Sequence, residues 1–184
     1  MPKPVAPQLT HMAVFAQDLP GTSKFYAEVL GLVVSDQGRS PNLGVDLIFM
    51  TADPEKHHQF VLVSGRKPGE PGNVQQVSFL VDNLEELRAV YRRALAAGVP
   101  TSRCVTHGNA FSTYFPDPEG NNIEVYCDTP WYVPQPFGVV VDLTRPDTEL
   151  EAENEALCRA TPGFMPRAAW KAEVASRIRA RMAA

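Results

Sequence analysis

The chain carries one sequence pattern twice, and this internal repeat constrains its fold more than any other feature. The segment "LTHMAVFAQDL" begins the first copy, and "NVQQVSFLVDNL" begins the second. Aligning His11 with Gln76, 65 positions later, also pairs Asp18 with Asn83. Two copies of one pattern predict two modules that share the same order of strands and helices.

The ends of the two copies also match, and they bring chemically capable residues into equivalent positions. "ADPEKHHQF" in the first copy resembles "PDPEGNNIEV" in the second, after a gap of two residues, and this match pairs His58 with Glu124. The repeat therefore places His11, Gln76, His58 and Glu124 at corresponding positions. All four side chains can bind a metal or take part in proton transfer.

Hydrophobic periodicity predicts the secondary structure of both copies. In the first copy it predicts a helix from Asp18 to Gly31 and strands over 9–17, 32–35, 45–50 and 58–63. In the second it predicts a helix from Asn83 to Gly98, with Glu86 in a capping box, and strands over 74–81, 101–106, 111–116 and 122–127. Residues 64–73, rich in Gly and Pro, read as a hinge, and "DPEGNN" reads as a tight turn. Each copy is thus a βαβββ module.

The residues after the repeat form a separate C-terminal part in this interpretation. We expect one domain over 1–128, with modules 8–64 and 73–128, followed by a C-terminal extension over 129–184. The extension begins with a Pro- and aromatic-rich segment, and two helices follow, one capped by Asp147 and one starting at Pro166 with a basic face. Trp131 and Tyr132 are expected at the rim of the site or at a subunit interface, where aromatic residues are favoured.

Composition and charge exclude several classes of protein. The net charge of −4 gives no sign of nucleic-acid binding over the whole surface. No apolar stretch approaches the roughly 20 residues that span a bilayer, and the N-terminus lacks the apolar core of a signal peptide, so no membrane contact and a cytoplasmic location are expected. Three unclustered cysteines, Cys104, Cys127 and Cys158, are expected as free thiols and not as a disulfide framework.

The two modules, with "LTHMAVFAQDLPGTSKFYAEVLGL" at one end and "YFPDPEGNNIEVY" at the other, resemble the vicinal oxygen chelate superfamily. This family includes glyoxalase I, extradiol dioxygenases, methylmalonyl-CoA epimerase and the fosfomycin and bleomycin resistance proteins. The resemblance covers roughly residues 8–128. It implies an α+β fold in which two βαβββ modules form an open half-barrel sheet, and it also implies a homodimer.

The resemblance further implies a divalent metal in the cup of the half-barrel, held from the first and last strands of each module. Carried over by position, its ligands are His11, His58, Gln76 and Glu124. Gln76 departs from the extradiol pattern, which has His there and which uses the His at position 58 for acid–base chemistry and not as a ligand. Fe(II) is favoured because two His and one carboxylate suit it, but Mn, Zn and Ni fit the same donor types.

Two further residues match the extradiol pattern around a catechol. Tyr114 stands ten residues before Glu124, and His107 precedes Tyr114 by seven. A Tyr hydroxyl can hold a catecholate oxygen, and a His can donate a proton to the reacting dioxygen. The resemblance therefore assigns catalytic roles to Tyr114, His107 and His58.

Three hypotheses for function follow, each with a small-molecule ligand. The first is an extradiol-type dioxygenase that cleaves a catechol-like substrate with O2. The second is a metal-dependent glyoxalase-like lyase or epimerase, which moves a proton beside a carbonyl and which Gln76 favours. The third is a binding protein without catalysis, such as a drug-sequestering member of the family. The sequence alone does not identify the substrate.

Overall fold

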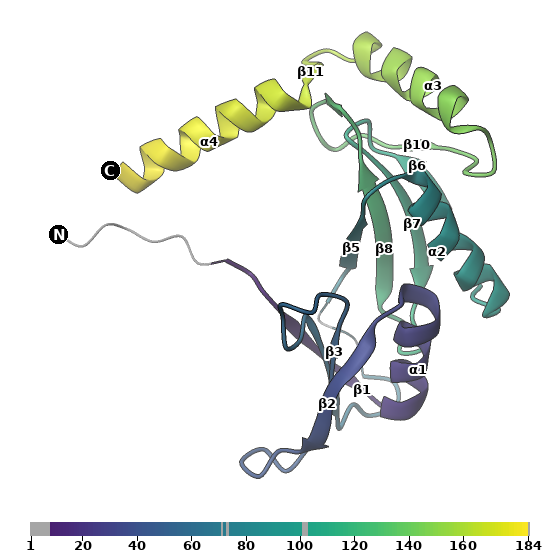
Figure 1. The fold of residues 1–184 in the computed structure, drawn as a ribbon, viewed down its shortest axis with the longest axis vertical. Helices are drawn as coiled ribbons and strands as arrows, with labels where there is room; N and C mark the ends of the chain where they lie inside the picture. Colours follow the sequence, from purple (N-terminus) through teal and green to yellow (C-terminus); the bar gives the residue numbers. More distant parts are fainter. Residues whose placement is uncertain (1–7, 71, 73, 101–102, 184) are drawn as a thin grey trace.

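The computed structural model describes residues 8–70, 72, 74–100 and 103–183, and it contains the predicted βαβββ module twice (Figure 1). The first module consists of β1 (Met12–Ala16), α1 (Leu19–Leu30), β2 (Val33–Arg39), β3 (Asp46–Thr51) and β4 (Phe60–Ser64). The second consists of β5 (Val77–Val81), α2 (Leu84–Ala96), β6 (Arg103–Thr106), β7 (Ala110–Pro116) and β8 (Asn122–Asp128). This arrangement confirms the predicted α+β class.

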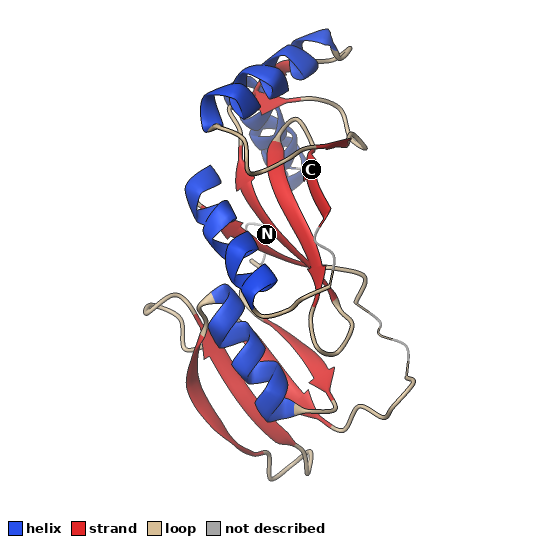
Figure 2. Ribbon diagram, turned by 90° about the vertical axis from the view of Figure 1, so that its right-hand side faces the viewer, coloured by secondary structure: helices blue, strands red, loops and turns tan. Residues whose placement is uncertain are grey.

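Each module has its own open sheet, and both sheets follow the same topology. The first has the strand order β1-β4-β3-β2, and the second has the order β10-β6-β7-β8-β5, where β10 (Val139–Val140) comes from the C-terminal part. In each sheet the first strand of the module pairs in parallel with the last one. Helices α1 and α2 cover one side of the two sheets, and we call the opposite side the open face (Figures 1 and 2).

Several element boundaries differ from the predicted ones in a way that matters for the site. The strands predicted to begin at His58 and near Val74 begin later, so His58 and Gln76 lie just before β4 and β5. Residues 101–102 of the predicted strand and residues 71 and 73 of the predicted hinge lie outside the described part. Phe60 and Val77, the first residues of these strands, are both buried in the core.

The predicted helix starts are confirmed for both modules. The Asp18 side chain accepts a hydrogen bond from the Gly21 backbone N–H at 3.1 Å, and the Asn83 side chain accepts one from the Glu86 N–H at 2.9 Å. Glu86 returns a hydrogen bond from the Asp82 N–H at 3.0 Å, as a capping box requires. These local signals were readable in the sequence because each depends on a few neighbouring residues.

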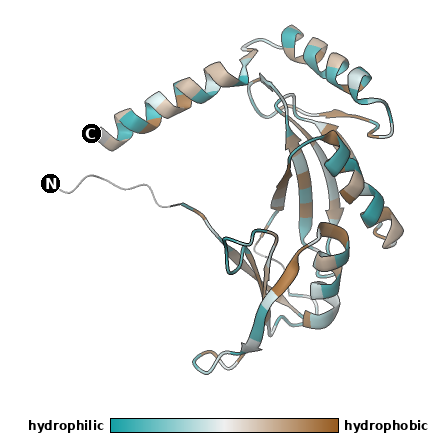
Figure 3. Cartoon of the chain, in the orientation of Figure 1, coloured by the Kyte–Doolittle hydropathy of each residue, from teal (hydrophilic) through white to brown (hydrophobic). Residues whose placement is uncertain are grey.

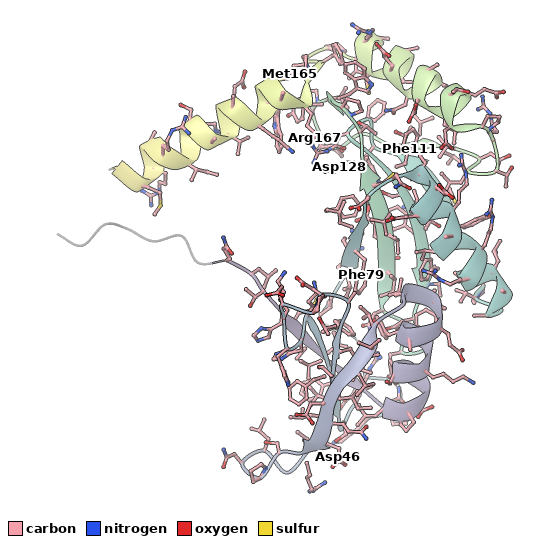
Figure 4. The ribbon with its side chains drawn as sticks, in the orientation of Figure 1. Asp46, Phe79, Phe111, Asp128, Met165 and Arg167 are labelled. Atoms are coloured by element: carbon pink, nitrogen blue, oxygen red, sulfur yellow. The ribbon has the colours of Figure 1, made fainter. Side chains whose placement is uncertain are left out.

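One hydrophobic core runs beneath both modules. The Tyr26 ring from α1 lies 4.5 Å from the Phe60 ring and 6.2 Å from the Phe79 ring, measured between centroids, so side chains from both modules meet there (Phe79 in Figure 4). On β1 the core receives Val14, whereas Phe15 faces outward, because side chains alternate along a strand. The common core joins the modules although no ladder links the two sheets in the described residues.

A buried carboxylate from the second module binds the helix of the first. Glu119, in the turn between β7 and β8, accepts hydrogen bonds from the backbone N–H groups of Gln17 and Asp18 at 2.7 and 3.0 Å. It also accepts one from the Thr22 hydroxyl at 3.2 Å, and its other oxygen pairs with Arg66 at 3.2 Å. The acidic side chain thus sits at the N-terminus of α1, where the helix dipole favours negative charge.

The predicted "DPEGNN" turn is confirmed, and its aspartate does more than close the turn. Asp117 accepts hydrogen bonds from the backbone N–H groups of Glu119 and Asn121 at 2.9 and 2.8 Å. Its second oxygen accepts a hydrogen bond from the Tyr26 hydroxyl at 2.9 Å. Burial, with the charge of Asp117, raises the pKa of Tyr26 far above its usual range, so Tyr26 remains a donor. The turn is therefore a second contact between the modules.

The C-terminal part consists of two helices and short strands that fold back on the second module. These elements are β9 (Trp131–Tyr132), β10, α3 (Asp147–Ala160), β11 (Met165–Pro166) and α4 (Arg167–Ala183). The predicted cap at Asp147 is wrong, because Pro146 occupies the cap position and Asp147 pairs with Arg88. No described helix is both long and apolar enough to span a bilayer.

Trp131 and Tyr132 pack within this C-terminal part. The Tyr132 ring stacks on Trp170 of α4 at 5.2 Å, and the Trp131 ring lies 5.6 Å from Phe164. Arg167 at the start of α4 pairs with Asp128 of β8 at 2.7 Å, an ion pair that can be located in Figure 4. Both aromatic residues thus pack against the C-terminal part, and their expected place at the rim or at a subunit interface stays a prediction.

The structure predicts that the three cysteines are unreactive in the folded protein. Cys104, Cys127 and Cys158 are buried free thiols, as expected, and burial raises the pKa of each, that of Cys127 to about 11. Thiolate, the reactive form, is therefore scarce at pH 8. A colorimetric thiol reagent should modify none of the three quickly in native protein and all three in denaturant. Fast, stoichiometric modification of one native thiol would contradict this packing.

The Glu119 contacts predict a large effect of one conservative substitution. Glu119→Gln removes the charge opposite Arg66 and weakens the hydrogen bonds to α1, so it should lower the free energy of unfolding by about 2–4 kcal/mol. Urea unfolding followed by circular dichroism measures this change. Glu28→Gln is the matched control, because Glu28 forms only an exposed ion pair with Lys24 at 3.8 Å and should change little. Equal effects of both substitutions would exclude the proposed role of Glu119.

Candidate functional site

The two histidines predicted as metal ligands lie together at the start of the first sheet. His11 directly precedes β1 and His58 lies two residues before β4, and these strands run parallel with Met12 beside Phe60. The His11 and His58 ring centroids are 4.4 Å apart. His57 Nδ1 lies 2.9 Å from His58 Nδ1. Partial burial, together with repulsion from His11 and His57, lowers the pKa of His58, so His58 favours the neutral form that binds metals or accepts protons.

The other two predicted ligands lie together on the second sheet. Glu124 on β8 stands beside Ser78 on β5 in the parallel register. Gln76 Nε2 donates a hydrogen bond to Glu124 Oε2 at 2.7 Å, and the Ser78 hydroxyl donates to the same oxygen at 2.7 Å. The Gln76 amide oxygen accepts from Asn122 Nδ2 at 3.4 Å. With this amide orientation, Gln76 presents a donor to Glu124, so the amide would have to turn before its oxygen could bind a metal beside Glu124.

Tyr114 and His107 extend this cluster along the open face of the second sheet. Tyr114 stands opposite Glu124 in the antiparallel β7–β8 register, and its hydroxyl donates to Glu124 Oε1. His107 Nε2 lies 2.7 Å from the Tyr114 hydroxyl, and His107 Nδ1 lies 2.6 Å from the carbonyl oxygen of Phe137. The sequence-predicted residues Gln76, Glu124, Tyr114 and His107 thus form one continuous hydrogen-bonded chain.

The hydrogen bonds of this chain limit where its protons can lie. A carbonyl oxygen only accepts, so His107 Nδ1 carries a proton toward Phe137. The Tyr114 hydroxyl has a single proton, which it can share with Glu124 or with His107 Nε2. Glu124 Oε1 lies 4.0 Å from His107 Nε2. A proton can move between His107 and Glu124 through the Tyr114 hydroxyl.

Burial controls the protonation of Tyr114 itself. Burial first, and then the hydrogen bond to Glu124 and its charge, raise the pKa of Tyr114 to about 12. The phenol therefore remains protonated at neutral pH. Arg103 on β6, opposite Tyr114 in the register, places its guanidinium carbon 5.1 Å above the centre of the Tyr114 ring.

The four predicted ligands do not converge on one point within a single chain. The His11–His58 pair belongs to the first sheet and the Gln76–Glu124 pair to the second, and among the described residues no group of three His, Cys, Asp or Glu side chains could hold a metal. A cavity of about 350 Å³ lies between β1 and β5, where it is lined by His11 of one module and Ser78 of the other. The donor types fit a divalent cation, whereas their arrangement in one chain gives two half-sites.

Sequence reasoning missed three contributors to this cluster. Ser78 could have been found, because it lies two residues after Gln76 and a strand alternates with a period of two. Arg103 could have been found in the same way, because it lies four residues before His107 on the strand that ends just before this histidine. The Phe137 carbonyl carried no signal, because its contact depends on how the C-terminal part returns to the sheet.

Comparisons with known proteins agree with the geometry. A family model described as the glyoxalase/bleomycin resistance protein/dioxygenase superfamily matches residues 8–125. Biphenyl-2,3-diol 1,2-dioxygenase 3 of Rhodococcus globerulus is 28% identical over 131 residues, which is 67% of this chain and 65% of that protein. Biphenyl-2,3-diol 1,2-dioxygenase 2 of the same organism is 27% identical over 128 residues, which is 66% of this chain and 63% of that protein. The chain thus spans slightly less than two thirds of the length of these curated relatives.

Solved structures share the fold at low sequence identity. A glyoxylase/bleomycin resistance protein/dioxygenase domain from Frankia sp. EAN1pec matches with a TM-score of 0.57 at 17% identity, over 68% of this chain and 100% of that one. The fosfomycin resistance protein FosX from Listeria monocytogenes, in complex with Mn(II) and sulfate, matches with a TM-score of 0.53 at 17% identity, over 68% of this chain and 95% of that one. With the family match over more than half of its length, the chain belongs to the glyoxalase/bleomycin resistance protein/dioxygenase superfamily.

Proposed function

We propose that the chain is a metal-dependent enzyme that cleaves a catechol-like aromatic ring with dioxygen, in the manner of an extradiol dioxygenase. The observation that carries this proposal is the hydrogen-bonded chain from His107 through Tyr114 to Glu124. The similarity to two biphenyl-2,3-diol dioxygenases supports it independently. We favour Fe(II) and keep Mn, Zn and Ni as alternatives, since all accept the same donor types.

The residues of the cluster suit this chemistry. A bound Fe(II) would supply Lewis acidity that favours a deprotonated diol, together with electrons for dioxygen. Tyr114, protonated because its pKa is raised to about 12, could turn its hydroxyl from Glu124 and donate a hydrogen bond to an anionic oxygen of the substrate. His107 replenishes or accepts the proton through Tyr114, and the Phe137 carbonyl holds its ring in one orientation. His58, whose pKa is lowered, is mainly the neutral imidazole at neutral pH and so is free to take up a proton.

We also propose that two copies of the chain complete the site between them. His11 and His58 of one copy would face Gln76 and Glu124 of the other, in a homodimer with two equivalent sites. Support comes from the separation of the half-sites and from exposed apolar side chains on the strands beside them. Phe15 on β1 is 62% exposed and Leu80 on β5 is 58% exposed, and the apolar start of β2 is also exposed (brown in Figure 3).

A second candidate is a metal-dependent lyase or epimerase, which Gln76 favours. An amide oxygen is a neutral and weaker ligand than imidazole, and lyase chemistry needs a Lewis acid without redox activity. In this reading Glu124 would move the proton beside a substrate carbonyl. Hydrogen–deuterium exchange at the carbon next to that carbonyl, without oxygen, would distinguish this reaction from ring cleavage.

The proposed activity predicts that a variant which loses the metal also loses oxygen consumption. Protein purified without chelator should contain about one iron per chain and consume oxygen with a catechol panel while a yellow product forms. Glu124→Ala should lose the metal and the activity, whereas Glu28→Ala, an exposed residue on α1, should keep both. Bound zinc or nickel without oxygen consumption would favour the lyase. Failure of the wild type to take up any metal would leave a non-catalytic binding protein.

The shared site predicts complementation between two inactive variants. His11→Ala and Glu124→Ala should each be inactive, but dimers that contain one chain of each have one site with both residues intact. A refolded equimolar mixture should recover about a quarter of wild-type turnover per chain, because half of the dimers are mixed and one of their two sites works.

The control for complementation is each variant refolded alone, which should stay inactive. Differently tagged chains show by mass spectrometry whether mixed dimers have formed. Mixed dimers without recovered activity would show that each chain closes its own site, while the proposed reaction itself would still stand if the wild type is active.

A further inference from the structure

Arg103 occupies a position on the open face that the proposed reaction does not yet use. It lies on β6 opposite Tyr114, and its side chain is exposed. Its neighbour Cys104 points the other way, into the core beneath α2. Alternation along the strand therefore places Arg103 on the same face as Tyr114 and Glu124.

The guanidinium of Arg103 has no anionic partner in the part of the chain that the structure describes. No carboxylate there lies within 4.0 Å of it, and no hydrogen bond from its side chain is formed to a described residue. Asp142, on the segment that follows β10, accepts hydrogen bonds from Thr144 N and Oγ1 at 2.9 and 2.7 Å instead. By contrast, ion pairs engage other arginines, namely Arg39, Arg66, Arg88, Arg145, Arg159 and Arg167.

The guanidinium of Arg103 lies over the Tyr114 ring, with its central carbon 5.1 Å from the ring centre. The N–H donors at its edge remain available, and their fork geometry matches the two oxygens of a carboxylate. Among the described residues, Arg103 is also the one Lys or Arg side chain on the strands of the second sheet.

The position relative to Glu124 determines which molecule Arg103 can bind. The Tyr114 ring lies between Arg103 and Glu124, since its face meets the guanidinium and its hydroxyl meets the carboxylate. An anion that binds Arg103 would therefore lie about one aromatic ring away from Glu124. A substrate that reaches both positions needs a polar end near Glu124 and an anionic end near Arg103.

We infer that the substrate is a vicinal aromatic diol that carries a carboxylate, and that Arg103 binds this carboxylate and sets the specificity. The inference rests on the proposed function, because that proposal places the diol beside Glu124. Arg103 takes no part in the bond-breaking step. Arg103 favours an anionic diol over a neutral diol of the same shape, because its guanidinium forms a bidentate, charge-assisted pair of hydrogen bonds with the carboxylate.

Binding of two matched diols tests this assignment without catalysis. The ligands are 3,4-dihydroxybenzoate and 4-methylcatechol, which differ in a carboxylate against a methyl group. Each is titrated by calorimetry into Fe(II)-reconstituted full-length protein without oxygen. The wild type should bind the carboxylate at least about 10-fold more tightly, the range expected for a hydrogen bond between charged groups.

Three variants assign the preference to the side chain. Arg103→Gln should bring the two dissociation constants to within about threefold of each other by weakening only the carboxylate. Arg103→Lys should keep part of the preference, because it retains the charge but not the fork. Arg92→Gln is the matched control, since Arg92 is exposed on α2 on the other side of the sheet, and the wild-type preference should persist.

The outcomes separate this inference from the proposed function. If the wild type binds both diols equally well, Arg103 does not set specificity, while the diol site stands. If Arg103→Gln weakens both diols to the same extent, Arg103 only supports Tyr114, and the inference is overturned. If neither diol binds the metal-loaded wild type, both the inference and the proposed function fail.

Discussion

The burial of two carboxylates from one turn is the constraint on which the rest of the structure depends. Glu119 and Asp117 leave the second module and enter the first, where Glu119 meets the start of α1 and Asp117 meets Tyr26. Buried charges are tolerated only when their hydrogen bonds are complete. The donors on α1 must therefore stay where the turn can reach them, and this requirement holds the two modules, and with them the two half-sites, in one arrangement.

Local features of the fold were predictable from the sequence, and the arrangement of the half-sites was not. Asp18, Asn83 and Gly31 predict helix ends correctly, because a cap depends only on residues within one helical turn. His58 and Gln76 were expected on strands, but they lie just before β4 and β5. The separation of the His11–His58 pair from the Gln76–Glu124 pair depends on how the two modules pack. Long-range contacts such as the Glu119–Arg66 ion pair determine this packing, and a local sequence pattern does not contain them.

A metal that binds Glu124 would have to compete with the hydrogen bonds that this carboxylate already accepts. Glu124 accepts from Gln76, Ser78 and Tyr114, so each of its oxygens already has a donor. A cation must replace some of these contacts, and the Gln76 amide must reverse to offer its oxygen. In the proposed enzyme, Glu124 would then join a bound metal to the hydrogen-bonded path through Tyr114 and His107.

His107 is hydrogen-bonded to the carbonyl oxygen of Phe137, and Phe137 lies beyond the residues that the family model matches, which end at 125. Gln135 and Asn154 reach the same loop, where they donate to the carbonyls of His107 and Gly108 at 2.8 and 2.9 Å. The orientation of the His107 ring therefore depends on residues of the C-terminal part, which the family model does not include. A domain boundary placed at the end of the family match would therefore leave out residues that hold the His107 ring. A relative with a different C-terminal part would need other contacts to hold an imidazole at this position.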